Sequence, residues 1–303
     1  MIKITDVTES NTALVIKFQN ETEKLFIKTI KTTENVYHSQ SMRETEFYRF
    51  IKANSITNVP LPKCHDIFLS EEKGVFLIVL DDVSETHTAP RILDKNIWFS
   101  CAESLAKLHA AFWEHKSIKS MYEEDEAHVN KLKERVPQFI NDFSDKFDDR
   151  TKNTLLKAME ISVMQLKETA HRVKNNENVT ICNGDSHIHN FMIPVAGNGS
   201  PLIVDFQFWG EGLGTGDLAH LTRVDFSDKI VPLVECYHKA LLANGVSGYS
   251  WDCCFRDYRM SAASMVLIPM WQYTGFGLGY EKWKDNLQNL VDDFDCLKCG
   301  EIL

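Results

Sequence analysis

Residues 181–194 of the chain read ICNGDSHIHNFMIP, and residues 202–221 read LIVDFQFWGEGLGTGDLAHL. Each stretch contains a short apolar run of strand length that leads into polar residues. Asp185 and Asn190 lie in the first stretch with four residues between them, and Asp205 ends the apolar run of the second. Short strands that present polar groups at their ends are typical positions of active-site loops. These two stretches are therefore the first candidates for a functional site.

The three side chains suit phosphoryl transfer assisted by magnesium. This reaction needs a carboxylate beside the attacking hydroxyl, which orients it and accepts its proton, and oxygen ligands for the Mg²⁺ that bridges the phosphates. Mg²⁺ prefers carboxylate and amide oxygens and keeps several waters. Asp185, Asn190 and Asp205 offer one orienting carboxylate and two oxygen ligands of this kind. The carboxylate needs no raised pKa, because a loose transition state makes positioning matter more than basicity.

The first eighty residues predict strands and one helix. The runs at 13–18 and 24–30 are rich in β-forming residues, and the polar turn between them at 19–22 predicts a hairpin. Residues 35–53 have a helical pattern, and the continuous apolar run at 75–80 is of strand length. A polar stretch follows this strand, which makes it a plausible lobe boundary.

Helices dominate the remainder of the sequence. Apolar residues recur at helical spacing in 96–115 and 151–173, and the chain from residue 217 onward again has a helical pattern. Two short strand-like pieces, 179–182 and 202–206, interrupt these helices and precede the polar clusters described above. The prediction is a mixed α+β protein with its strands concentrated near the N-terminus.

Composition excludes several classes of partner. With a net charge of −10 and no stripe of Lys and Arg, nucleic-acid binding is not expected. The N-terminus MIKITDVTES lacks the pattern of a signal peptide, and no apolar run approaches the roughly 20 residues of a membrane span, so no membrane partner is expected. The eight scattered cysteines, including the Cys296/Cys299 pair, are interpreted as reduced thiols of a cytoplasmic protein.

The phrases NGDSHIHN (183–190) and IVDFQ (203–207) resemble the aminoglycoside phosphotransferase and choline kinase superfamily. Its usual phrase is "HGD-hydrophobic-H-x-x-N" followed by an apolar strand ending in Asp. Two motifs are most similar to the ecdysteroid-kinase-like branch of this superfamily: E-x-x-F-Y, which begins at Glu44, and DFQFWGEG (205–212). The resemblance implies a two-lobed, protein-kinase-like fold. A small N-terminal lobe (1–82), an antiparallel sheet plus a helix, would precede a larger, mainly helical C-terminal lobe (83–303).

The resemblance also implies a reaction and a set of roles. The protein would use ATP and Mg²⁺ to phosphorylate a hydroxyl of a small molecule. Asp185 would be the catalytic base, and Asn190 and Asp205 the magnesium ligands. Lys28, paired with Glu44, would contact the α- and β-phosphates of the nucleotide.

Further positions follow from the same resemblance. The backbone at Leu80 and Asp81 would form the hinge that holds the adenine. His187 would shape the catalytic loop, and Asp217 would organise a neighbouring loop. LAKLHAAFW (105–113) is similar to a helix of the superfamily.

Two positions depart from the family pattern. Asn183 stands where the family usually has His, and its amide can replace the hydrogen bonds of that imidazole. The stretch at 8–13, which corresponds to the phosphate-covering loop between the first two strands of family members, contains no Gly, although Ser10 and Asn11 can donate hydrogen bonds to phosphate. These departures leave open a second hypothesis, a catalytically silent nucleotide- or ligand-binding protein on the same fold.

Two other interpretations remain open at the level of sequence. His187 and His189, with Asp185, Asp205 and His220, also suit a zinc site of a metal-dependent hydrolase. A set of aromatic residues in the second half of the chain predicts core packing, and some of its members are candidates to line a substrate pocket; they are Trp209, Trp251, Trp271, Tyr273 and Trp283. The acceptor and the oligomeric state have no readable signal.

Overall fold

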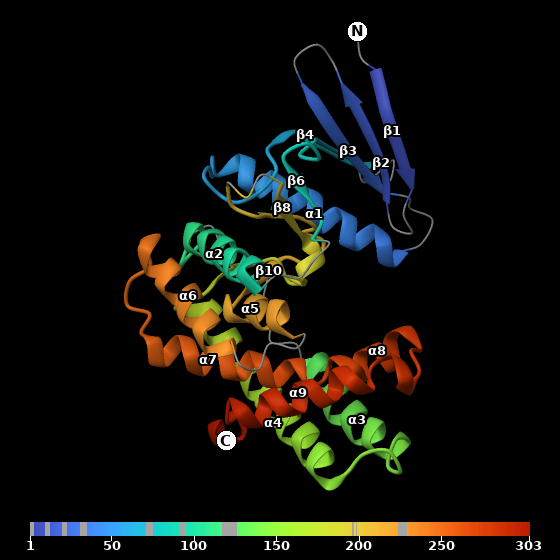
Figure 1. Cartoon of the computed structure of the whole chain (residues 1–303), viewed down its shortest axis with the longest axis vertical. Helices are drawn as coiled ribbons and strands as arrows, with labels where there is room; N and C mark the ends of the chain where they lie inside the picture. The colour runs from blue at the N-terminus through green and yellow to red at the C-terminus, as the bar shows by residue number, and fades with distance from the viewer. Residues whose placement is uncertain are drawn as a thin grey trace. The chain divides into compact units, whose positions relative to one another are not determined.

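The structure is a computed structural model of the 303-residue chain (Figure 1). It divides into two compact units, which are described separately: unit 1 is Met1–Ala111 with Asn183–Trp209, and unit 2 is Phe112–Cys182 with Gly210–Leu303. The residues that the structure describes are 3–9, 13–19, 23–30, 35–70, 75–90, 95–116, 126–195, 197, 199–223 and 229–303.

Unit 1 is built on a five-stranded antiparallel sheet with the strand order β1-β2-β3-β5-β4. Val15 on β2 lies opposite Lys28 on β3, which lies opposite Ile78 on β5. Residues opposite one another on neighbouring strands point to the same face of a sheet, so these side chains share one face. The strands are β1 (Lys3–Glu9), β2 (Ala13–Gln19), β3 (Lys24–Ile30), β4 (Cys64–Ser70) and β5 (Val75–Asp81).

The helix α1 (Asn35–Ala53) packs against β3, β4 and β5 (Figure 1). It contributes Phe47 and Tyr48 to a core that also contains Phe76 and Ile78, all of them at most 1% exposed. Burying this apolar surface is the main force that fixes the helix on the sheet. The helix therefore presents the side chain of Glu44, one turn before Tyr48, to the same face.

The rest of unit 1 contains residues 183–194 and 202–209 of the two stretches singled out from the sequence. Short strands form a second sheet in the order β6-β8-β9, and the Ser104 hydroxyl donates a 2.8 Å hydrogen bond to the Pro201 carbonyl. This bond fixes α2 against the chain just before β9. The elements are β6 (His87–Thr88), α2 (Lys95–Ala111), η1 (Ile188–Asn190), β8 (Phe191–Pro194) and β9 (Leu202–Ile203).

Unit 2 is mainly helical, and α7 is its central helix, in contact with α4, α5, α6 and α9 (Figure 1). Its two short strands, β7 (Thr180–Cys182) and β10 (Gly210–Gly212), pair antiparallel. The helices are α3 (Glu126–Asp142), α4 (Asp149–Asn175), α5 (Thr215–Thr222), α6 (Ile230–Ala243), α7 (Trp251–Met265), α8 (Ile268–Phe276), η2 (Tyr280–Lys282), α9 (Lys284–Cys296) and η3 (Cys299–Ile302).

The predicted fold class is confirmed: an N-terminal antiparallel sheet with a helix precedes a larger helical part. The strand at 24–30 and the helix at 35–53 have the bounds that the sequence predicts. The strand β1 and the helix α3 were not predicted. The lobe division after residue 82 stays a prediction, since the two units group the chain differently. No helix among the described ranges has the length and apolarity of a membrane span.

Candidate active site

Lys28 lies at the centre of a three-member ion cluster. Its Nζ atom is 2.7 Å from Oε2 of Glu44 and 3.2 Å from Oδ1 of Asp205. Burial alone would lower the pKa of Lys28, but the two carboxylates outweigh burial and raise the pKa above its usual range. The side chain is therefore an ammonium ion at neutral pH. The cluster joins β3 to α1 and to the segment after β9.

Glu44 is only 3% exposed, which is unusual for a glutamate and requires that its charge be satisfied. Besides the Lys28 ammonium, it accepts a 3.4 Å hydrogen bond from the Phe206 backbone N–H at Oε1. The rings of Phe47 and Phe206 are stacked, with centroids 3.8 Å apart and planes 4° apart. Glu44 is thus bound to the segment that carries Asp205 as well as to Lys28.

Asp205 has a left-handed backbone conformation, with a φ of 64°. Such conformations are costly for residues other than glycine and persist only where neighbours hold them. The Asn183 amide donates to the Asp205 carbonyl at 2.9 Å, and the Gln207 amide lies 3.5 Å from Oδ2 of Asp205. The backbone and one carboxylate oxygen of Asp205 therefore each have a partner, while Oδ1 faces Lys28.

Asn183 forms hydrogen bonds at both ends of its amide group, which join the loop at 183–190 to the segment of Asp205. It is fully buried, and its Oδ1 accepts the backbone N–H of Asp185 at 3.1 Å while its amide donates to the segment of Asp205. One amide group thus donates and accepts, as an imidazole in its place would. It joins the loop of the proposed base to the residue of the proposed metal ligand.

Asp185 and Asn190 lie side by side at the two ends of this loop. The Asn190 amide donates to the Asp185 carbonyl at 2.8 Å and lies 3.5 Å from its Oδ2. His187 Nε2 is 3.6 Å from the same carboxylate oxygen. The backbone N–H of Val204 donates to the Asn190 carbonyl at 2.9 Å, which brings the two stretches together.

Unit 1 contains a cavity of about 300 Å³ that Lys28, Glu44, Asn190 and Asp205 line together. Its remaining walls combine apolar residues from the sheet with the chain that follows β5. This volume and mixed lining suit a small-molecule ligand. The other lining residues are Val15, Lys17, Phe26, Tyr48, Pro62, Leu80, Asp81, Asp82, Val83, Ser84, Met192 and Val204.

The end of β5, with the predicted hinge residues Leu80 and Asp81, and the chain that follows it form one edge of the cavity. The Asp81 N–H donates to the Lys63 carbonyl at 3.0 Å, and the Asp82 N–H donates to the Lys24 carbonyl at 3.0 Å. Neither N–H can serve a ligand without breaking a bond. In the described part of the chain no hydrogen bond from the Val83 N–H is present, so this group is the donor that remains at the edge.

Lys17 and Asp82 form an ion pair on the same edge, 3.5 Å apart. Burial raises the pKa of Asp82, but hydrogen bonds from Ser84 and the charge of Lys17 outweigh it and lower the pKa below its usual range. The carboxylate is therefore ionised at neutral pH. The sequence analysis predicted no role for this ion pair or for Phe26. The two-residue period of a strand does place Phe26 on the same face as Lys28, so a signal for Phe26 was present in the sequence.

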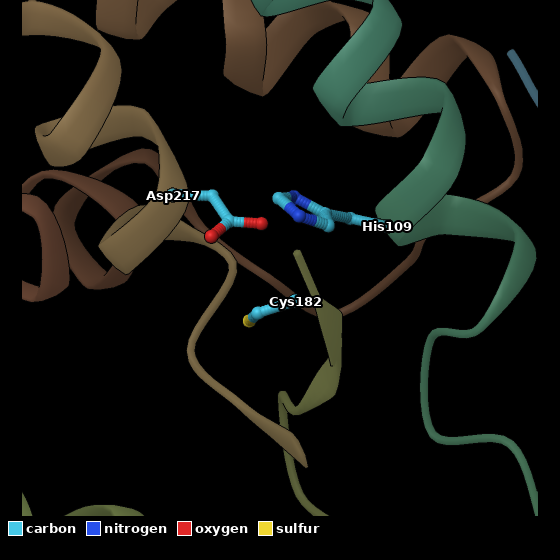
Figure 2. A group of neighbouring side chains, drawn as sticks. All are labelled: His109, Cys182 and Asp217. Carbon is cyan, nitrogen blue, oxygen red and sulfur yellow. The ribbon is translucent and has the colours of Figure 1, made fainter. Parts of the chain in front are cut away.

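Two of the predicted site residues, Ser10 and Asn11, fall outside the described residues. Asp217 belongs to unit 2, in the first turn of α5, where its carboxylate lies within 4.8 Å of the Cys182 thiol (Figure 2; His109, also labelled there, belongs to unit 1). Burial and then the Asp217 charge raise the pKa of Cys182, which makes this thiol unreactive.

Magnesium fits the donors of the cavity better than zinc does. Asn190 and Asp205 offer an amide and a carboxylate on one cavity wall, which are oxygen ligands of the kind that Mg²⁺ prefers. His187 and His189 have ring centroids 5.9 Å apart, and within the described ranges they do not join Asp185 and Asp205 as a group of three close metal ligands. The zinc interpretation therefore has no support from the geometry.

The aromatic residues singled out from the sequence are partly core. Trp209 and Trp283 are 4% and 0% exposed, while Trp251, Trp271 and Tyr273 are half-buried on α7 and α8. Trp209 packs on α1 in unit 1 with ring centroids 5.6 Å from Phe47. None of the five lines the cavity described above.

Solved structures share this fold. A candidate aminoglycoside phosphotransferase from Ralstonia eutropha matches with a TM-score of 0.60 and 11% identity, over 99% of this chain and 93% of its own. The microcompartment-associated aminopropanol kinase matches with a TM-score of 0.60 and 9% identity, over 98% and 91%. A complex of aminoglycoside phosphotransferase APH(4)-Ia with ADP and hygromycin B matches with a TM-score of 0.55 and 11% identity, over 98% and 95%.

At these identities the structural likeness shows the fold alone. The comparison with curated proteins gives no match. The sequence profile of one family, however, matches residues 2–244, which is most of the chain and includes Lys28, Glu44, Asp185, Asn190 and Asp205. The chain therefore belongs to the ecdysteroid kinase-like family.

Proposed function

We propose that the protein is a small-molecule kinase that transfers the γ-phosphate of ATP to a hydroxyl of its substrate, with Mg²⁺ as cofactor. Lys28, oriented by Glu44, would bind the α- and β-phosphates. Asn190 and Asp205 would hold Mg²⁺, which offsets the charge that develops on the transferred group. Asp185 would orient the acceptor hydroxyl and accept its proton.

The base of the nucleotide would occupy the apolar part of the cavity. Phe26 shares its strand face with Lys28 two residues away, so its ring is available to stack on a base. Val83 would donate its backbone N–H to the edge of the base. We assign this role to Val83 and not to Asp81, because the Asp81 N–H already donates to the Lys63 carbonyl.

Asp185 is suited to orienting a hydroxyl by position alone. Its backbone N–H is fixed by Asn183, its carbonyl by Asn190, and its carboxylate lies near His187. A base held in this way supplies the preorganisation on which phosphoryl transfer depends. The observation that carries the proposal is the single cavity lined by Lys28, Glu44, Asn190 and Asp205.

Thermal stability with nucleotide tests the proposal without knowledge of the acceptor. A ligand that binds only the native state must raise the melting temperature. We expect ATP to raise the melting temperature in the presence of Mg²⁺ and the Asp205→Ala variant to lose that increase. If neither ATP nor GTP raises the melting temperature at saturating concentration, the proposed function is wrong.

The alternative is a catalytically silent binding protein on the same fold, favoured by the glycine-free stretch at 8–13. Magnesium-dependent ATP consumption that Asp185→Asn abolishes would exclude it. Nucleotide binding without any consumption, across a broad screen of small hydroxyl-bearing acceptors, would favour it. A reducing compartment such as the cytosol is part of our proposal, and all eight cysteines are free thiols in the structure.

A further inference from the structure

Arg43 and Trp209 form a reciprocal pair of hydrogen bonds between α1 and the segment after Asp205. The Trp209 indole Nε1–H donates to the Arg43 carbonyl at 2.6 Å, and the Arg43 guanidinium donates to the Trp209 carbonyl. Each residue thus donates from its side chain and accepts at its backbone. Arg43 directly precedes Glu44, and Trp209 is four residues beyond Asp205.

Aromatic packing surrounds this pair. The Trp209 ring lies 5.6 Å from the ring of Phe47 and 6.1 Å from that of Phe50, and Phe206 stacks on Phe47. Trp209 is 4% exposed, so its indole N–H would be costly to leave without a partner. The helix and the segment are therefore joined along three turns of α1, one of which carries Glu44.

We propose that Arg43 and Trp209 are positioning residues, which hold α1 in the one placement where Glu44 reaches Lys28. The inference deepens the proposed function, and the measurement of nucleotide affinity described below rests on that function. A helix on an open sheet can slide or tilt, and a shift of about 1 Å at a catalytic group can cost about a hundredfold in rate. Because the pair bonds backbone carbonyls on both sides, it fixes the two backbones directly.

The alternative explanation is that Trp209 is only a core residue. The two explanations differ in what a conservative substitution does. Trp209→Phe keeps an aromatic ring in the core and removes the indole N–H. Arg43→Ala removes the guanidinium without touching the core, and Arg49→Ala, an exposed arginine of the same helix, is its matched control.

The first measurement is hydrogen–deuterium exchange of the Phe206 backbone N–H, which donates to the Glu44 carboxylate, in the native protein. This amide exchanges when the contact opens, so its rate reports how firmly Glu44 is held against the segment of Asp205. Loss of one hydrogen bond between Arg43 and Trp209 is expected to raise the exchange rate about fivefold in Trp209→Phe and in Arg43→Ala, and to leave it unchanged in Arg49→Ala. An unchanged rate in both variants would overturn the proposal.

The second measurement is nucleotide affinity in two backgrounds. Arg43→Ala should weaken Mg–ATP binding about fivefold in the wild type and less than twofold when Glu44→Gln is already present, because both changes act on Lys28. Equal weakening in both backgrounds contradicts positioning through Glu44. If wild-type protein binds no nucleotide, the proposed function fails, while the exchange rates of the Phe206 N–H still decide the role of the pair.

Discussion

The Lys28 ammonium lies 2.7 Å from the Glu44 carboxylate and 3.2 Å from the Asp205 carboxylate. Lys28 and Asp205 are 177 positions apart in the chain. One cation thus holds together a strand, a helix and the segment that carries the proposed metal ligand. Because Glu44 is almost fully buried, its charge depends on this partner. The arrangement makes Lys28 part of both the stability of unit 1 and its proposed chemistry.

Replacement of Lys28 should therefore cost stability as well as nucleotide binding. Lys28→Met leaves the buried Glu44 carboxylate without its cation, which is expected to lower the free energy of unfolding by about 3 kcal/mol. Lys24→Met on the same strand is the control, since its pair with Glu85 is exposed and worth less than about 1 kcal/mol. Urea denaturation of both variants measures the difference, and equal losses would contradict the structural role of Lys28.

Asn190→Asp should separate magnesium binding from catalysis. The variant keeps an oxygen ligand but loses the N–H that donates to the Asp185 carbonyl, and it places a second carboxylate near Asp185. We expect magnesium-dependent stabilisation by ATP to survive while ATP consumption falls about ten- to a hundredfold. Loss of both properties together would mean that Asn190 acts mainly in metal binding.

Gly184→Ala should destabilise the loop at 183–190. Gly184 has a φ of 85°, and a Cβ atom there would lie 2.2 Å from the Phe208 carbonyl oxygen, which belongs to the backbone and cannot yield cheaply. The combined strain and overlap are expected to cost about 2–4 kcal/mol. Gly216→Ala on α5, where a Cβ meets nothing within 4 Å, should be neutral or slightly stabilising in the same denaturation experiment.

The eight thiols should differ sharply in reactivity. Cys253 and Cys296 are exposed, whereas burial raises the pKa of Cys254 and of Cys299 to about 12. At pH 8 an alkylating reagent is expected to modify Cys253 and Cys296 at least about tenfold faster than the two buried thiols, because the thiolate is the nucleophile. Mass spectrometry reads out each site, with the denatured protein as the reference in which all eight react.

The same pKa shifts predict a loss of stability at alkaline pH. Burial raises the pKa of Cys64 to about 11 and that of Cys254 to about 12, above the usual value near 9, so the unfolded chain releases these protons first. The contribution of these protonated thiols to the free energy of unfolding is complete below about pH 9. It decreases as the pH rises toward their pKa values in the folded state, by about 1 kcal/mol per thiol at pH 10. Cys254→Ala should show a correspondingly smaller loss of unfolding free energy between pH 8 and pH 10. A loss as large as that of the wild type would exclude Cys254 as a source.

Local pattern was enough for several elements, and the resemblance to a known superfamily identified some members of the candidate site. The bounds of β3 and α1 follow from apolar period and residue type, and the resemblance identified Lys28 and Glu44 on them. Other features have no local signal. The strand β1 is exposed along the described side chains and lacks an apolar alternation, so only its pairing with β2 defines it. Trp209 was interpreted only as a core or pocket aromatic, because nothing nearby in the sequence indicates a partner in α1.

The sequence by itself determined the chemistry that is available: an ammonium, three carboxylates and an amide, in a fixed order along strands and loops whose periods are local properties. Tertiary structure alone decided which of these groups meet. The contact of Lys28 with Asp205, the left-handed backbone of Asp205 and the Arg43–Trp209 pair each depend on residues more than 20 positions apart in the chain. Such contacts are set by packing of the sheet, α1 and the β9 segment, and packing is a collective property that no short stretch of sequence carries.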